Sequence, residues 1–403
     1  MTKQVRTLSI VGTRPEAIKM VPVIRELRQH PLTETVLVST AQHREMLDQV
    51  FSLFDLVPDV DLNIMLPRQS LNDIVRRAVE GLDHVYQQYH PDVVLVQGDT
   101  TTAFAASLAA FNRKIPAAHV EAGLRSCQLW NPYPEEANRR LIAAIASMHF
   151  APTKKSADNL RRENIPPPSI YVTGNTGIDC LFRIIESRKS HLAQYLPEGF
   201  HVHGGRMILV TAHRRENVGG PLEQLCEAVR ELALQDPTTW YLYPVHLNPA
   251  VRDTVLPRLS GLRNIALTEP LPYGAFVEAM AASYFILTDS GGVQEEAPAL
   301  GKPVLVLRET TERPEGIASG VAMLVGMEKK QIVQETRRLL NDEFAYQRMV
   351  GYGNPYGDGK AAKRTVGALV HWLGLGPRPQ EFDEVIPDHP PIEERHAMVA
   401  VAD

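Results

Sequence analysis

Short apolar runs alternate with amphipathic stretches along most of the chain, and this alternation constrains the fold more than any other feature. The runs that predict strands cover residues 8–11, 35–39, 92–97, 117–120, 207–211, 240–245, 265–268, 284–288 and 304–307. Helices are predicted between them, including 44–50, 102–111, 135–146 and one opened by Pro15, since proline is well tolerated in the first turn of a helix. Continuous apolar strands that alternate with helices predict α/β architecture with parallel sheets covered on both faces.

The length predicts two domains. A chain of 403 residues exceeds the size of an ordinary single domain, and each half repeats the strand–helix scheme, so we expect two Rossmann-like domains. Apolar periodicity lapses between Ser187 and Gly205, where proline and glycine gather, and this favours a junction there. The predicted bounds are 1–186 and 206–353, and a helix near 360–374 is expected to pack back on the first domain. Residues 376–403 form a proline-rich acidic tail that we expect to be disordered.

Charge and cysteine content exclude several classes of protein. The formal charge of −5 resides in the tail, which leaves the folded body neutral and gives no support to a nucleic-acid partner. The three cysteines have neither disulfide nor metal spacing, which favours a reducing compartment. The N-terminus has no signal-peptide core and the chain has no apolar run of about 18 residues. The sequence therefore predicts a cytoplasmic protein without a membrane partner.

Polar residues follow several strands of the first half, at the sheet edge where parallel α/β sheets bind ligands. Arg14 and Lys19 lie in the first turns of the helix that follows the first strand, where cations and backbone amides suit a phosphate. Asp99 and Glu121 follow two consecutive strands and are expected to converge, although Asp99 alone is equally explained as a helix cap. Glu135 opens a helix, where the structural alternative is an i,i+4 pair with Arg139.

The second half repeats this arrangement. His213 follows the strand 207–211, and the charged residues after it favour an open edge over a core histidine. Ser290, Gly291 and Gly292 follow the strand 284–288, where glycines allow backbone amides to approach a phosphate. Glu296, one turn further, is suited to a ribose diol, and Arg313 lies in a later polar loop.

The motifs of common cofactors are missing. No Gly-x-Gly-x-x-Gly follows a strand of the first domain, and the segment Gly351–Lys360 fails the P-loop spacing. Neither His-x-x-x-His nor Cys-x-x-Cys occurs as a zinc pair. We therefore expect no cofactor and no metal.

Several segments, in order, resemble the non-hydrolysing UDP-N-acetylglucosamine 2-epimerases. They are GTRPEAIKMVPVI, AQHREML, QGDTTTAFAASLAAF, HVEAGLRS, PYPEEANR, VTGNTGID, TAHRREN, DSGGVQEEAPALGKPVLVLRETTERPEG and NPYGDGKA, and they cover the chain from Gly12 to about Lys360. The resemblance implies a GT-B-like fold with the active site in the interdomain cleft, UDP held mainly by the second domain, and a homodimer.

The resemblance also implies roles for individual residues. The implied substrate-binding residues are Arg14, Lys19, Asp99, Glu121, His213, Leu271, Phe276, Ser290, Gly291, Gly292, Glu296 and Arg313. The implied catalytic residues are Asp99, Glu121, Glu135 and His213. In some bacterial relatives a second UDP-N-acetylglucosamine acts as an activator, and the matching positions are Gln42, Glu45, Arg68, Glu135, Arg214 and His246. Two residues depart from those relatives, which carry glutamine where this chain has Leu271 and Glu45.

The expected activity is an isomerase reaction at carbon 2 of UDP-N-acetylglucosamine, giving UDP-N-acetylmannosamine for surface polysaccharide synthesis. Elimination of UDP to 2-acetamidoglucal and its re-addition would need cations at the diphosphate and carboxylates at the sugar. The alternatives are a glycosyltransferase of the same fold, a hydrolysing epimerase, an epimerase of a UDP-diacetamido-uronic acid, and a non-catalytic nucleotide-sugar sensor.

Overall fold

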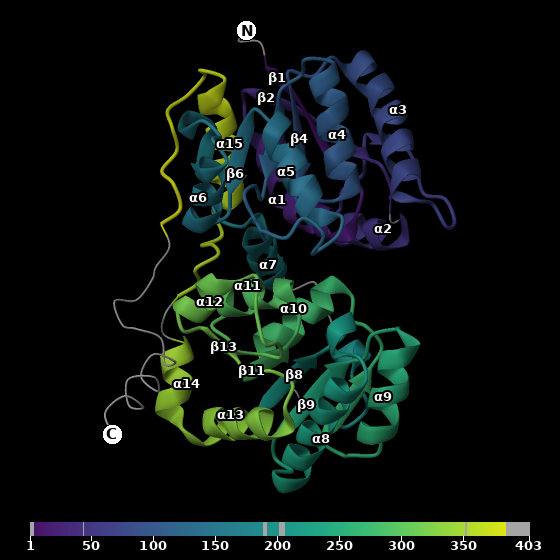
Figure 1. Cartoon of the computed structure of the whole chain (residues 1–403), viewed down its shortest axis with the longest axis vertical. Coiled ribbons are helices and arrows are strands. Elements are labelled where there is room, and N and C mark those ends of the chain that lie inside the picture. The colour runs from purple at the N-terminus through teal and green to yellow at the C-terminus, as the bar shows by residue number, and fades with distance from the viewer. Residues whose placement is uncertain (1–3, 43, 188–191, 201–205, 351–352, 384–403) are drawn as a thin grey trace. The chain divides into compact units, whose positions relative to one another are not determined.

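The computed structural model of the chain describes residues 4–42, 44–187, 192–200, 206–350 and 353–383 (Figure 1). The chain divides into two compact units. The first unit is built from Met1–Phe182 and Tyr356–Glu384, and the second contains Arg183–Pro355. The sequence places the junction within 187–205, whereas the division falls between Phe182 and Arg183, inside the helix α7. Of the predicted junction, residues 188–191 and 201–205 lie outside the described residues.

The first unit contains a seven-stranded parallel sheet in the order β3-β2-β1-β4-β5-β6-β7. Its strands are β1 (Val5–Val11), β2 (Thr33–Ser39), β3 (Val60–Asp61), β4 (Val93–Gln97), β5 (Ala117–Val120), β6 (Met148–Ala151) and β7 (Ile170–Val172). Chain order reverses between β1 and β4, which makes their boundary the topological switch point of a doubly wound sheet. The predictions of strands at 8–11, 35–39, 92–97 and 117–120 are confirmed.

Helices cover both faces of this sheet (Figure 1). They are α1 (Arg14–Gln29), α2 (Arg44–Leu53), α3 (Leu71–Tyr89), α4 (Thr101–Asn112), α5 (Glu135–Ile145), α6 (Lys154–Arg162), η1 (Pro167–Ser169), α7 (Thr176–Ser187) and α15 (Ala361–Trp372). One layer packs α3 against α4 and α4 against α5, and another packs α1 against α2 and α15. The predicted inward stripe of α1 is buried, at Ile18, Val21, Ile24 and Leu27, because residues three or four apart share one helix face.

The second unit repeats the topology with a six-stranded parallel sheet in the order β10-β9-β8-β11-β12-β13. Its strands are β8 (Met207–Thr211), β9 (Trp240–Pro244), β10 (Ile265–Thr268), β11 (Phe285–Thr288), β12 (Val304–Val306) and β13 (Ala322–Leu324). The surrounding helices are η2 (Leu192–Tyr195), η3 (Arg215–Asn217), α8 (Gly220–Gln235), α9 (Pro249–Leu259), α10 (Tyr273–Ala282), α11 (Gly291–Ala299), α12 (Pro314–Ala318), α13 (Lys329–Asn341) and α14 (Glu343–Val350). The switch point here lies between β8 and β11.

The prediction that residues 376–403 are disordered is wrong for residues 376–383. Phe382 is 4% exposed, packs in a core cluster with Val172, and donates its N–H to the Val172 carbonyl at 2.8 Å. The Arg378 guanidinium lies 4.2 Å from the Tyr171 ring centroid. Residues 376–383 therefore line the β7 edge of the first sheet, held there by Phe382 and Arg378. The prediction failed because it was based on the acidic composition of the whole tail, which does not reveal these two contacts. Residues 384–403 lie outside the described residues.

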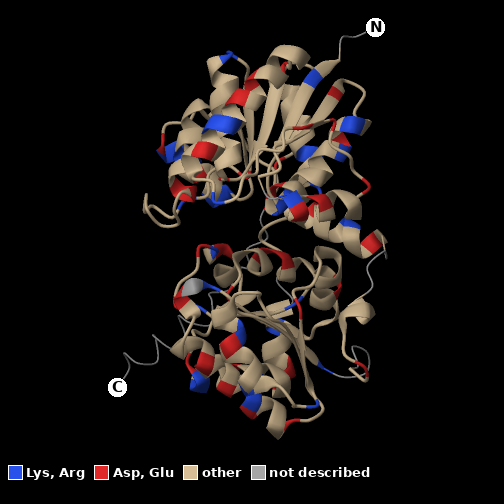
Figure 2. Cartoon of the chain, turned by 90° about the vertical axis from the view of Figure 1, so that its right-hand side faces the viewer, with Lys and Arg blue, Asp and Glu red and all other residues tan. Residues whose placement is uncertain are grey.

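Charged side chains of both signs are interspersed over the helices and loops of each unit, and the strands are largely free of them (Figure 2). Across the described residues, no helix combines the length and the apolar character needed to cross a membrane.

Candidate active site

The first unit brings its loops together tightly at the switch point. A Cβ on Gly12 would lie 2.4 Å from Thr40 Oγ1 and 2.5 Å from Thr102 Oγ1, so the turn after β1 accepts no side chain at this position. The turn leads into α1, whose first residue, Arg14, is half-buried. This packing sets the predicted cation beside the N-terminus of α1, a place that suits an anion.

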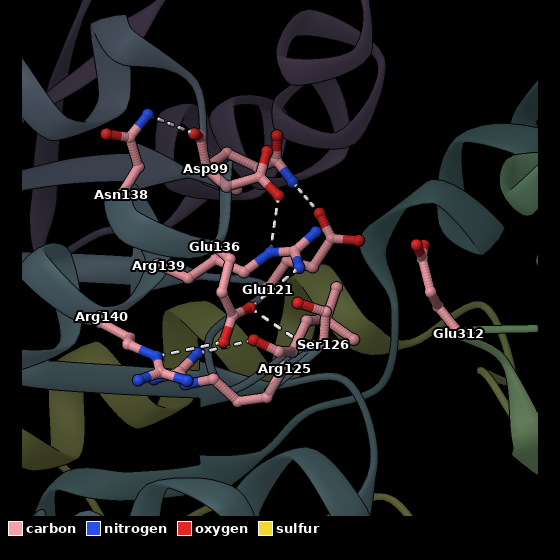
Figure 3. A network of polar contacts seen from close by, with 12 residues as sticks. Asp99, Glu121, Arg125, Ser126, Glu136, Asn138, Arg139, Arg140 and Glu312 are labelled. Atoms are coloured by element: carbon pink, nitrogen blue, oxygen red, sulfur yellow. Dashed lines mark hydrogen bonds and ion pairs between the residues drawn. The ribbon is translucent and has the colours of Figure 1, made fainter. Parts of the chain in front are cut away.

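Asp99 and Glu121 follow β4 and β5, which are paired neighbours in the sheet. Glu121 forms an ion pair with Lys19 and accepts a hydrogen bond from Gln97 Nε2. Its backbone has a φ of +65°, a conformation that costs free energy in a non-glycine residue and is frequent at functional sites. The structure therefore brings together three predicted residues, Lys19, Asp99 and Glu121, on one edge of the first sheet. Figure 3 shows Asp99 and Glu121. Gln97 is a contributor that the sequence analysis did not single out.

The structural alternative for Glu135, an i,i+4 pair with Arg139 on α5, is not among the ion pairs of the described residues. Arg139 Nε instead donates to Asp99 Oδ2 at 2.8 Å, and Arg139 Nη1 lies 3.3 Å from Glu136 Oε2 (Figure 3). Among the described residues, no group donates a hydrogen bond to the buried Oε2 of Glu135. Helical spacing places two acids, Glu135 and Glu136, within reach of Arg139. The third acid, Asp99, comes from the loop after β4, and residue spacing along α5 cannot predict that contact. Glu135 is thus left with an uncommitted carboxylate oxygen.

Glu136, adjacent to Glu135, has a structural role. It is buried, and its carboxylate accepts from the Ser126 N–H at 3.0 Å and from Arg140 Nε at 3.1 Å. Burial alone would raise the pKa of Glu136, but these hydrogen bonds and the charge of Arg139 lower it below its usual value. Glu136 is therefore an ionised anchor for the Ser126 loop, whereas its neighbour remains available for chemistry.

A buried histidine is hydrogen-bonded to the loop that carries Asp99. His119 on β5 lies with its Nε2 2.7 Å from the carbonyl oxygen of Gly98, the residue before Asp99. Burial lowers the pKa of His119 to about 4, with the Gly98 carbonyl acting in the opposite direction. The ring is therefore neutral at physiological pH and donates a hydrogen bond to that carbonyl. The sequence offered no signal for this role, because His119 lies inside an apolar strand.

In the second unit, a buried aspartate organises the loop after β8. Asp289 Oδ2 accepts hydrogen bonds at 2.9 Å from the N–H groups of His213 and Arg214 and from Asn217 Nδ2. His213 Nδ1 lies 3.5 Å from Asp289 Oδ1, and the exposed His213 ring stacks on His246 with centroids 5.2 Å apart. Desolvation lowers the pKa of His213 and the charge of Asp289 opposes that change. Asp289 thereby fixes the backbone at the predicted histidine.

The N-terminus of α11 combines amide donors with cations. Ser290 precedes the helix, and Gly291 and Gly292 form its first turn. A Cβ on Gly291 would lie 3.4 Å from Arg313 Cζ and 3.6 Å from Arg214 Nη2, so the absence of a side chain keeps this space open beside two guanidinium groups. Arg313 Nε donates to Glu295 Oε1 at 2.6 Å, which holds Arg313 in place. Amides at a helix N-terminus with adjacent arginines are suited to a phosphate.

The predicted nucleoside-binding residues lie on the neighbouring elements. Leu271 is buried before α10 and Phe276 is half-buried within it. Glu296 Oε1 accepts a hydrogen bond from the Tyr273 hydroxyl at 2.9 Å, so α10 and α11 are joined at this position. Tyr273 is a second contributor that the sequence analysis did not single out.

The residues implied for an activator site are distributed over both units. In the first unit, Gln42 accepts from Thr102 Oγ1 at 2.7 Å, and Glu45 and Arg68 are exposed. In the second unit, Arg214 is half-buried and His246 is exposed beside His213. As for metals, the described residues include no cluster of three or more His, Cys, Asp or Glu side chains suited to hold an ion.

Two doubly wound units, each with convergent polar groups at its switch point, place the chain among GT-B-like α/β proteins. Comparison with known proteins then identifies the family. The sequence model of the UDP-N-acetylglucosamine 2-epimerase family matches residues 25–370. The UDP-N-acetylglucosamine 2-epimerase of Salmonella typhimurium is 52% identical over 370 residues, which cover 90% of this chain and 98% of that protein. The chain belongs to the UDP-N-acetylglucosamine 2-epimerase family, whose members are isomerases.

Solved structures agree with this assignment. The epimerase of Neisseria meningitidis, crystallised with UDP-N-acetylglucosamine, aligns with a TM-score of 0.83 and 48% identity over 91% of this chain and all of that one. The Methanocaldococcus jannaschii enzyme, in complex with UDP-N-acetylglucosamine and UDP, aligns with a TM-score of 0.75 and 33% identity over 91% of this chain and all of that one.

Proposed function

We propose that the protein interconverts UDP-N-acetylglucosamine and UDP-N-acetylmannosamine without hydrolysis. The observation that carries the proposal is that Asp99 and Glu121 follow the paired strands β4 and β5, while Glu135 on α5 has a carboxylate oxygen, Oε2, that accepts no hydrogen bond from the described residues. The phosphate-type site at the N-terminus of α11 supports the assignment of UDP to the second unit. We assign the diphosphate to Ser290–Gly292 and Arg313, and the chemistry at the sugar to the carboxylates of the first unit.

Carbon 2 of the substrate bears an acetamido group and has no adjacent carbonyl, so its proton is only weakly acidic. We therefore propose elimination: the C1–O bond to UDP breaks, a carboxylate takes the proton from carbon 2, and 2-acetamidoglucal forms. The UDP oxygen then re-attacks carbon 1 while another acid returns a proton to the opposite face of carbon 2. The atoms balance without an oxidant, and three acids on different elements serve both faces.

The diphosphate must carry the negative charge that develops when the C1–O bond breaks. Arg313, Arg214 and His213 lie in the second unit with the amides of α11, and positioned donors of this kind stabilise departing oxyanions. Lys19 is paired with Glu121, so we propose that it orients that carboxylate toward the sugar.

The test is turnover of UDP-N-acetylglucosamine alone in deuterated water, followed by NMR. We expect UDP-N-acetylmannosamine with deuterium at carbon 2. Product without deuterium would exclude the elimination route, free N-acetylmannosamine with UDP would indicate a hydrolysing enzyme, and no reaction without an acceptor would favour a glycosyltransferase. A parallel incubation with a UDP-diacetamido-uronic acid distinguishes the related substrate class.

Four further proposals concern the context of the reaction. We propose that the protein acts in the cytoplasm as a homodimer and supplies surface polysaccharide synthesis. Light scattering of the purified chain tests the dimer, and loss of a surface polysaccharide on deletion of the gene tests the pathway. Activation by added UDP-N-acetylglucosamine, lost on Arg68→Ala, tests the activator site.

A further inference from the structure

The first unit contains a buried carboxylate that the proposed reaction does not use. Glu16 lies in the first turn of α1 and is 1% exposed. Its Oε2 accepts hydrogen bonds from the N–H groups of Gly12 at 2.9 Å and Thr13 at 2.7 Å. Its Oε1 accepts from Thr100 Oγ1 at 2.5 Å. One side chain therefore joins the loop after β1 to the loop after β4, on the two strands that flank the switch point.

Thr100 directly follows Asp99, and Asp99 itself is hydrogen-bonded to side chains of another helix. The Asp99 carboxylate accepts from Arg139, and its carbonyl oxygen accepts from Asn138 Nδ2 at 2.9 Å (Figure 3). Both donors come from α5, so α5 holds Asp99 from one direction. Glu16, through Thr100, connects the same loop to α1. Without that link the Asp99 loop would keep its contacts to α5 but lose its side-chain hydrogen bond to α1, the helix that begins at Arg14.

Helix capping alone does not explain Glu16. Capping uses only one of its oxygens, the one that accepts from Gly12 and Thr13, whereas the other reaches a residue 84 positions away. Acids in the first turn of a helix are favourable at the surface, but burying a carboxylate is costly. Burial raises the pKa of Glu16 to about 7, and the hydrogen bonds from Thr100 and the turn act in the opposite direction. Buried polar groups beneath a site commonly hold its reactive residues in place.

We propose that Glu16 is a positioning residue for Asp99, acting through Thr100 to hold the Asp99 loop against the turn that carries Arg14. The inference rests on the proposed function, because it assigns to Asp99 a part in that reaction. Glu16 itself touches no substrate in this account.

The test compares Glu16→Ala with Glu16→Gln, and Thr100→Val with Thr100→Ser. Glutamine retains an oxygen for the turn and a polar group for Thr100, and serine retains the hydroxyl. We expect Glu16→Ala and Thr100→Val to lower kcat about 100-fold with little change in KM, since misplacing a catalytic group by about 1 Å costs that much. Glu16→Gln and Thr100→Ser should stay within about threefold of wild type. Glu26→Gln on the same helix is the matched control.

A double-mutant cycle separates positioning from general loss of stability. Both Glu16→Ala and Thr100→Val remove the link, although Thr100→Val also removes the hydrogen bond by which Thr100 caps α4 and Glu16→Ala also removes the bonds to Gly12 and Thr13. The loss in the double variant should therefore be clearly less than the product of the two single losses. Hydrogen exchange followed by mass spectrometry should show faster exchange in residues 98–104 of Glu16→Ala and not of Glu16→Gln. Full kcat in Glu16→Ala, or fully multiplicative losses in the double variant, would overturn the inference.

The outcomes also distinguish this inference from the proposed function. If the wild-type protein does not epimerise the substrate, the proposed function fails, and hydrogen exchange alone decides whether Glu16 holds the loop. If the wild type is active and Glu16→Ala does not fold, the Thr100→Val and Thr100→Ser pair decides. Equal kcat in those two variants would then reject the positioning role.

Discussion

Replacement of Glu16 by glutamine should make the protein more resistant to unfolding at alkaline than at acidic pH, relative to wild type. Burial raises the pKa of Glu16 from 4.5 to about 7, so the folded protein binds a proton that the unfolded chain has released between these values. The contribution of Glu16 to the free energy of unfolding of the wild type therefore falls as pH rises from 4.5 through 7. Above pH 7 this group lowers the free energy of unfolding no further. Glutamine has no such titration and removes the effect.

The magnitude follows from the two pKa values. Each pH unit between them changes the free energy of unfolding by about 1.4 kcal/mol, which amounts to about 3 kcal/mol in all. Because Glu16 is fully buried, solvent screening does not reduce this figure in the way it does at a surface. The free energy of unfolding of Glu16→Gln minus that of wild type should accordingly increase by about 3 kcal/mol between pH 4.5 and pH 8.

The assay is urea unfolding of both proteins at half-unit pH steps, followed by far-UV circular dichroism. Taking the difference at each pH cancels every other titrating group that the substitution leaves unchanged. Glu26→Gln, at a half-buried position of the same helix, controls for loss of a carboxylate from α1. A difference that is flat with pH, or that decreases between pH 5 and pH 8, would refute the assignment of Glu16 as a buried acid that titrates near neutrality.

Three other substitutions test the site and the fold. Glu121→Gln should lower kcat by about 100-fold or more, as expected for loss of a general acid or base, and unchanged turnover of UDP-N-acetylglucosamine would remove Glu121 from the reaction. Arg313→Met should weaken UDP binding by about tenfold or more in isothermal titration calorimetry, because hydrogen bonds to charged groups contribute about 1.5–3 kcal/mol; an unaltered Kd would place the diphosphate elsewhere. Phe382→Ala should reduce the free energy of unfolding by about 3 kcal/mol in urea melts, and a loss below about 0.5 kcal/mol would mean that the segment 376–383 contributes little to the first unit.

The regular elements were largely predictable, and the failures have a common cause. The run Met207–Thr211 became a strand with those bounds, and so did Ala117–Val120, although it contains His119. The strands that were missed, β3, β6, β7 and β13, are short, with two to four residues each. Edge strands such as β3, with two residues, form because a neighbouring strand offers backbone partners. No local pattern encodes such a partner.

The sequence by itself determined the alternation of strand and helix, and with it the edge of each sheet at which polar residues collect. That step needs only local periodicity and the rule that parallel strands end on the same side. Only the tertiary structure decided which of those residues are bonded to one another. Arg139 on α5 bonds to Asp99 and Glu136 and not to Glu135. Glu16 bonds to Thr100, because β4 lies beside β1 in the sheet. Strand order and register bring residues that are distant in the sequence within hydrogen-bonding distance of each other. Neither strand order nor register can be predicted from the spacing of residues along the chain.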